Sequence, residues 1–282
     1  MKKILKQLAP PVLVSLIQKL QKLQKPQKPK ETKLRFPTFE EAALTCQSNA
    51  YQNDEVVKVV VEKNVLYKEK LNQEPIFDLA SLRTLIALGA SKTTHKLNVI
   101  DFGGGGGYHY TLSNIAFGSN NHISWNVVET PAMSKEAKRL ENEKLKFFDN
   151  IADAKNSMGD IDLVFTSGAL QYCPNPLRFL QDLVEINAPH LFITRTPFLE
   201  SSNEIITIQA SKLSSNGPGP LPNGFTDRTI TYPITYVSRK AAEEILKKNY
   251  DIRFMTDEGE GGFGLNGEMV TMNGYFCVRK GQ

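Results

Sequence analysis

Short apolar runs alternate with amphipathic stretches over the last two-thirds of the chain, which predicts strands and helices in turn. The predicted strands cover residues 99–102, 124–129, 145–148, 162–167 and 191–195. Helices are expected after residue 107, from residues 131 and 176, and over residues 238–250. Residues 252–255 and 274–279 predict a terminal hairpin around a glycine-rich connector, residues 257–267. This rhythm is typical of a doubly wound α/β fold with a mostly parallel sheet.

A helical region is predicted ahead of the sheet, over residues 36–94. Thr38 and Glu41 have the spacing of a capping box, which predicts a helix beginning there. A second helix is expected to begin at Asp54, although its valines are β-branched, which lowers helix propensity. A third is expected over residues 78–88 with a stop at Gly89. Its apolar face is expected to be Leu79, Leu82, Leu85 and Ile86. Together these helices would cap the sheet domain, residues 95–282.

The first 35 residues form a basic segment. They carry ten Lys and Arg side chains and one Glu, a net charge of +9 against +4 for the whole chain, which leaves −5 elsewhere. Apolar residues recur in this segment at helical spacing: Leu13, Leu16, Ile17, Leu20 and Leu23. The pattern fits peripheral contact with an anionic membrane, packing on a partner helix, or a loosely ordered tail. It is too short to span a bilayer and lacks a signal-peptide core. The acidic remainder argues against a nucleic-acid partner.

Composition sets limits on the class of protein. The chain has 282 residues, of which 40% are hydrophobic and 23% charged, enough for one sizeable α/β core with extensions. Its three cysteines are far apart and lack CxxC spacing, and its four histidines are scattered. The sequence therefore predicts neither a disulfide framework nor a metal site, and favours a reducing cytoplasmic setting.

The strongest chemical signal is a run of five glycines, residues 103–107, directly after a predicted strand. Glycine permits positive φ and close backbone approach to a ligand. The spacing Asp101-x-Gly103-x-Gly105-x-Gly107 does not complete the dinucleotide fingerprint, which argues against an NAD-dependent oxidoreductase, and no phosphate-binding P-loop follows. A tight strand–helix turn without a ligand is the alternative interpretation.

Two carboxylates follow the next two predicted strands. Glu129 ends the strand after the glycine run, where an acidic side chain can accept both ribose hydroxyls of a cofactor. Asp149 ends the third strand, where it could receive the exocyclic amine of an adenine. The alternative for each carboxylate is a solvated charge at a strand end or turn, without a ligand.

These motifs resemble those of class I S-adenosylmethionine-dependent methyltransferases. Within that class, several segments resemble a narrower group of bacterial methyltransferases often encoded among surface-polysaccharide genes. The segments are Asp101-Phe102-Gly103-Gly104, Val127-Val128-Glu129, Ser167-Gly168, Leu170-Gln171-Tyr172 and Arg195-Thr196-Pro197-Phe198. The resemblance implies a Rossmann-like sheet of seven strands, one of them antiparallel, and S-adenosylmethionine as cofactor. It implies a cofactor site at Asp101, Gly103, Gly105, Gly107, Glu129, Asp149, Ser167 and Gly168. The uniform glycine run departs from the larger residues usual in this loop.

A methyltransferase of this kind needs mainly to align its acceptor, which is expected to be a glycan or a related small molecule. His109 is the candidate general base, and a surface or capping histidine is the alternative. Tyr172 and Arg195 are candidate acceptor contacts beyond the fourth and fifth strands. Arg195 fits either a clamp on an acidic acceptor or a structural ion pair. The insert over residues 201–236 contains aromatic residues and is expected to form an ordered cover, with disorder without function as the alternative. The alternative function is a non-catalytic relative serving as a binding or membrane-associated assembly subunit.

Overall fold

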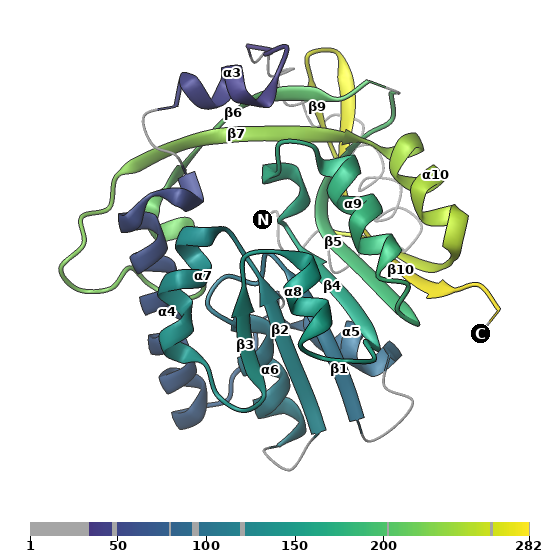
Figure 1. The fold of residues 1–282 in the computed structure, drawn as a ribbon. Coiled ribbons are helices and arrows are strands. Elements are labelled where there is room, and N and C mark those ends of the chain that lie inside the picture. The colour runs from purple at the N-terminus through teal and green to yellow at the C-terminus, as the bar shows by residue number, and fades with distance from the viewer. Residues whose placement is uncertain are drawn as a thin grey trace, which may run out of the picture.

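The computed structural model describes residues 34–281, except 47–49, 79, 92–95, 119–121, 202 and 260–261. The predictions made for residues 1–33, including the amphipathic stretch, lie outside this range. The described residues form a twisted β-sheet with helices on both faces (Figure 1). No helix in the described ranges combines the length and apolarity needed to cross a bilayer.

The central path of the sheet has seven strands, as predicted. Their order is β3 (Leu145–Phe148), β2 (His122–Val128), β1 (Lys96–Phe102), β4 (Leu163–Ser167), β5 (His190–Leu199), β10 (Glu268–Arg279) and β8 (Tyr250–Asp257). β10 runs antiparallel to both β5 and β8, while β1 to β5 pair in parallel. The predicted Rossmann-like α/β fold with one antiparallel strand in this path is therefore confirmed.

The parallel strands are buried on both faces, because alternate side chains enter two different cores. In β1, Val99 packs with the first core and Ile100 with the second, and both are fully buried. The first core receives α4 (Asp54–Gln73), α6 (Tyr108–Phe117) and α7 (Pro131–Ala137). The second receives α8 (Ile151–Asn156), α9 (Pro176–Glu185) and α10 (Arg239–Asn249). This arrangement leaves the carboxyl ends of the parallel strands for a site.

Side-chain caps fix where four of these helices begin. Thr130, Asn150, Asn175 and Ser238 each precede a helix and accept a hydrogen bond from a backbone N–H three residues later. α7 and α9 also begin with proline, whose fixed φ suits the first helical position. The predicted starts at residues 131 and 176 are confirmed.

The predicted helical region ahead of the sheet contains α3 (Phe39–Leu44), α4 and α5 (Ser81–Ser91). The Thr38 side chain caps α3 as predicted, and the valines of α4 are helical because they pack into the first core. For α5 the prediction was wrong in two respects. The helix continues past Gly89 to Ser91, and Leu82 and Ile86 are each 44% exposed. Its buried face carries Ser81, Thr84, Ala87, Leu88 and Ser91, small side chains for the most part.

The insert over residues 201–236 is ordered, as expected, and contains two strands. β6 (Ile205–Lys212) pairs antiparallel with β7 (Thr229–Ser238), and the end of β7 pairs in parallel with β5. These strands arch over the carboxyl ends of the sheet beneath α3 (Figure 1). The predicted connector between β8 and β10 likewise contains a strand, β9 (Phe263–Leu265), which pairs with β10.

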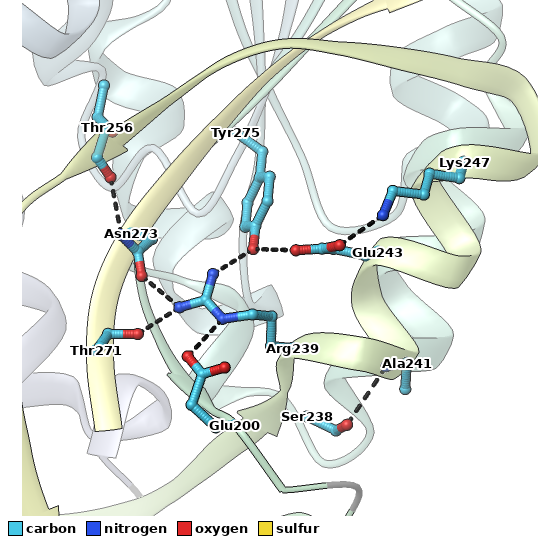
Figure 2. A network of polar contacts seen from close by, with 10 residues as sticks. All are labelled: Glu200, Ser238, Arg239, Ala241, Glu243, Lys247, Thr256, Thr271, Asn273 and Tyr275. Carbon is cyan, nitrogen blue, oxygen red and sulfur yellow. Dashed lines mark hydrogen bonds and ion pairs between the residues drawn. The ribbon is translucent and has the colours of Figure 1, made fainter. Parts of the chain in front are cut away.

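A polar network joins α10 to the antiparallel strand (Figure 2). The Arg239 guanidinium is 2.8 Å from Glu200 and donates to Tyr275 at 2.6 Å, to Asn273 at 2.6 Å, and to Thr271. The Arg239 side chain is 15% exposed; among its partners Tyr275 is buried, Thr271 and Asn273 are half-buried, and Glu200 is exposed. Its partners lie on β10 and at the end of β5, and the contacts therefore tie α10 to both strands.

Replacing Arg239 by methionine is expected to lower the free energy of unfolding by about 2–4 kcal/mol, because the buried Tyr275 hydroxyl and two half-buried side chains lose a charged donor. Urea unfolding followed by circular dichroism measures this. Arg178→Met is the matched control, since that arginine is 63% exposed in an ion pair on α9, and should cost below about 0.5 kcal/mol. Equal effects of the two substitutions would contradict a structural role of the network.

Candidate functional site

A cavity of about 1310 Å³ lies at the carboxyl ends of β1 to β5, between the glycine run and the β6–β7 insert. Open α/β sheets bind their ligands at this edge. Most of the site residues predicted from the sequence line it: Gly103, Gly105, His109, Glu129, Asp149, Ser167, Gly168, Tyr172 and Arg195. Asp101 and Gly107 do not line the cavity. The structure therefore brings nine of the eleven candidates to one place.

The glycine turn, residues 103–107, is shaped by alternate left-handed residues. Gly103, Gly105 and Gly107 have φ of 77°, 57° and 84°. A Cβ on Gly103 would lie 2.1 Å from the Cβ of Ala169, and one on Gly104 would lie 2.3 Å from a carboxylate oxygen of Asp101. The turn thus packs too closely on its surroundings for side chains, and its backbone faces the cavity.

Glu129 connects β2 to this turn. One carboxylate oxygen accepts from the N–H of Gly105 at 2.9 Å and the other from the N–H of Thr130 at 3.0 Å. Burial raises the pKa of Glu129; these two N–H donors oppose the rise, and the nearby charge of Asp101 adds to it. Each carboxylate oxygen can accept a further hydrogen bond, so the group remains able to bind hydroxyls in the cavity.

Asp101 lies beneath the turn, fully buried. One of its carboxylate oxygens accepts from Trp125 Nε1 at 2.9 Å and lies 2.8 Å from His109 Nδ1. The other has no hydrogen-bond partner among the described residues. A carboxylate at Nδ1 favours the tautomer that carries its proton there, which leaves Nε2 of His109 as a proton acceptor. The structure shows Asp101 in contact with the His109 ring. Contact between Asp101 and a cofactor stays a prediction.

Three tyrosines form a cluster that also lines the cavity. The rings of Tyr51, Tyr172 and Tyr232 have centroids 5.3–5.8 Å apart. Their hydroxyls donate to Asn216 at 3.0 Å, Gln209 at 3.1 Å and Ser211 at 2.9 Å respectively. Burial raises the pKa of all three, that of Tyr172 to about 12. The cluster is therefore neutral at physiological pH and offers aromatic and hydroxyl surface.

Tyr51 and Tyr232 were not among the predicted site residues. They come from the region ahead of the sheet and from the insert, and only folding brings them to Tyr172. Two signals for them are present in the sequence: the aromatic residues of the insert, and the segment Phe39-Glu40-Glu41-Ala42 followed by Tyr51, which resembles the same bacterial methyltransferases.

Asp149 and Ser167 lie at the ends of β3 and β4, where they line the cavity. Asp149 is exposed and Ser167 is half-buried. The start of α8 lines the same cavity. Contact of Asp149 with an adenine, and of Ser167 with the cofactor, stays a prediction.

No family model and no curated protein matches the chain. Among solved structures, it is similar to the [4+2]-cyclase SpnF, with a TM-score of 0.44 and 11% identity, over 71% of this chain and 81% of that one. It is similar to a S-adenosylmethionine-dependent methyltransferase from Clostridium acetobutylicum, with a TM-score of 0.43 and 11% identity, over 77% and 97%. It is also similar to the glycopeptide N-methyltransferase MtfA complexed with sinefungin, with a TM-score of 0.43 and 11% identity, over 71% of this chain and 87% of that one. At these values the matches carry no argument about the chemistry of this chain.

Proposed function

We propose that the chain binds S-adenosylmethionine in this cavity and transfers its methyl group to a small-molecule or glycan acceptor. The observation that carries the proposal is the position of Glu129. Its carboxylate lies at the end of β2, bonded to the N–H of Gly105, in the same cavity as Asp149. A hydroxyl-accepting carboxylate beside a glycine turn is the arrangement that holds the ribose of a nucleoside cofactor.

The residues present fit this cofactor. The glycine turn presents backbone without side chains, Glu129 can accept the ribose hydroxyls, and Asp149 can accept from an adenine amine. When bound, the cofactor supplies a methyl group on a positively charged sulfur, already activated for transfer. The protein then needs to align the acceptor and to accept a proton from it.

His109 is the residue we assign to accept that proton. Asp101 fixes its ring through Nδ1, and Phe165 packs edge-on against the ring with a centroid distance of 4.8 Å. The ring is therefore held with Nε2 as the basic atom at a position that lines the cavity. A hydroxyl acceptor gains nucleophilicity as it loses its proton there.

The tyrosine cluster and the insert would hold the acceptor. The cavity volume of about 1310 Å³ exceeds the roughly 300–1000 Å³ usual for a single small ligand, which supports donor and acceptor side by side. Gln209, Ser211 and Asn216 supply polar groups around the tyrosine rings, a combination that suits a hydroxyl-rich acceptor.

Calorimetric titration with S-adenosylhomocysteine tests the proposal, with NAD as the comparison ligand. We expect one equivalent of S-adenosylhomocysteine to bind and NAD to bind at least tenfold more weakly. Absence of S-adenosylhomocysteine binding by folded protein would overturn the proposed function and favour a non-catalytic role.

Binding is also expected to depend on pH through Glu129. Its pKa is raised in the folded protein, so the carboxylate becomes protonated at a higher pH than an exposed glutamate and then accepts fewer hydrogen bonds. The affinity for S-adenosylhomocysteine should therefore be full at pH 7–8 and fall as the pH is lowered toward 5. In Glu129→Gln this dependence should be absent. A wild-type affinity that stays constant over this range would contradict the assignment.

A further inference from the structure

Arg195 brings a guanidinium without a counter-ion into the cavity. The residue is exposed there, and its side chain makes no hydrogen bond or ion pair with any part of the chain that the structure describes. Arg83 also lines the cavity, but its Nε is 2.7 Å from a Glu258 carboxylate oxygen. The structural ion pair considered as one role for Arg195 is thus not formed in the described part of the chain. A planar guanidinium instead offers paired donors to a carboxylate or phosphate.

The backbone of Arg195 is strained. Its φ is 57°, in the left-handed region that favours glycine. The two other described non-glycine residues with positive φ, Asn187 and Asn266, are asparagines, which tolerate this region. Such conformations persist where the surrounding structure imposes them, and they concentrate at functional sites. The surrounding residues must therefore hold Arg195 in this conformation.

A β-bulge in the pairing of β5 with β10 imposes the conformation. Two residues of β5, Thr194 and Arg195, face the single residue Gly274 of β10. A Cβ on Gly274 would lie 2.3 Å from the Thr256 hydroxyl, so only glycine fits opposite the bulge. Bulges of this kind redirect a side chain out of the alternating pattern of the strand.

Two further residues, in the loop that follows β4, contact Arg195. The side-chain amide of Gln171 donates to the backbone carbonyl of Arg195 at 3.2 Å. A Cβ on Gly168 would lie 3.4 Å from the guanidinium carbon, an ordinary contact distance, so the two residues adjoin. The Ser-Gly and Leu-Gln-Tyr segments noted in the sequence therefore converge on the position of one cation.

The strand order separates this cation from Glu129 and Asp149, whereas Gly168, which is also predicted for the cofactor, adjoins it. The glycine turn, Glu129 and Asp149 follow β1, β2 and β3, while Arg195 lies on β5, with β4 between β5 and β1. Arg195 is close enough to Tyr51 and Tyr172 for its charge to favour their ionised forms, and the charge of Glu129 acts on Tyr51 in the opposite direction. The guanidinium thus lies beside the tyrosine cluster, which we assign to the acceptor.

We propose that Arg195 binds a carboxylate or phosphate group of the methyl acceptor, so that the acceptor is an anionic molecule. This inference rests on the proposed function for the location of the cofactor. The bulge holds the guanidinium in place before the acceptor arrives, which reduces the ordering needed on binding. Gln171 acts as a positioning residue through the Arg195 carbonyl.

Calorimetry on the protein saturated with S-adenosylhomocysteine tests this inference, with D-glucuronate, D-glucose 6-phosphate and D-glucose as probes. We expect at least one anionic sugar to bind tenfold or more tightly than glucose, and this preference to disappear in Arg195→Asn. Asparagine tolerates positive φ, so the variant should fold with an unchanged denaturation midpoint. Arg178→Asn removes an exposed arginine from α9 and should keep the preference. Equal binding of the three sugars, no binding of any, or a preference that survives in Arg195→Asn would overturn the proposal.

A second titration distinguishes an anion on the acceptor from the carboxylate of the cofactor. Arg195→Asn should bind S-adenosylhomocysteine and 5′-methylthioadenosine, which lacks the carboxylate, within twofold of wild type. A tenfold loss confined to S-adenosylhomocysteine would assign Arg195 to the cofactor and overturn the inference while leaving the proposed function intact. If the wild-type protein binds neither nucleoside, the proposed function fails, and the sugar titrations on ligand-free protein decide the anion site alone.

Discussion

Gly103→Ala should lower the free energy of unfolding by about 2–5 kcal/mol. The left-handed φ of 77° costs a non-glycine residue about 1–2 kcal/mol. The added methyl group would lie 2.1 Å from the Cβ of Ala169, and relieving such overpacking costs about 1–3 kcal/mol more. Because Ala169 directly follows Gly168, the relaxation should also displace the loop that adjoins Arg195. Urea unfolding measures this loss of stability. The slope of the free energy of unfolding against urea concentration should stay unchanged.

Gly159→Ala separates the two contributions. Gly159 has nearly the same φ, 75°, but a Cβ there would meet nothing within 4 Å. Only the conformational cost of about 1–2 kcal/mol should remain. If the two substitutions cost the same, the close contact between the glycine turn and the β4 loop is not a constraint on the site.

The second large effect concerns binding. Glu129→Ala should weaken binding of S-adenosylhomocysteine by at least about 100-fold, because two hydrogen bonds to a charged group, each about 1.5–3 kcal/mol, are lost. The substitution also removes the acceptor for the N–H of Gly105, which should leave the turn less well held. Glu129→Gln keeps the size and one acceptor oxygen, and a loss of about tenfold is expected. Calorimetry at pH 7.5 measures both.

Glu136→Ala is the control for this series. That glutamate lies on α7, its side chain is 33% exposed, and it pairs with Arg139, which lies in the turn directly after this helix. It should leave the affinity for S-adenosylhomocysteine within twofold of wild type. An affinity of Glu129→Ala equal to that of Glu136→Ala would remove Glu129 from the binding site.

The sheet and the starts of its helices could be predicted because their signals are local. Apolar runs marked the parallel strands, and capping residues such as Thr130 and Asn175 marked the helices. The position of Glu129 followed from the same rule, since the carboxyl ends of parallel strands meet at one edge. Gly103 and Gly105 were predicted from spacing, and both line the cavity.

The remaining features depend on contacts between distant segments. Tyr51 reaches Tyr232 only because the insert folds back as two strands over the sheet. The bulge at Arg195 depends on Gly274 of β10, far along the chain, and no periodicity in β5 indicates it. The buried face of α5 was predicted incorrectly because its helix packs with small side chains, so that the bulkier Leu82 and Ile86 remain partly exposed.

The central claim is that the glycine turn and Glu129 bind the nucleoside part of S-adenosylmethionine. A crystal structure of the protein with S-adenosylhomocysteine tests it most directly. We expect both ribose hydroxyl oxygens to lie within about 2.5–3.0 Å of the Glu129 carboxylate oxygens, with the turn backbone against the ligand. A ligand bound elsewhere, or a ribose that makes no contact with Glu129, would contradict the account.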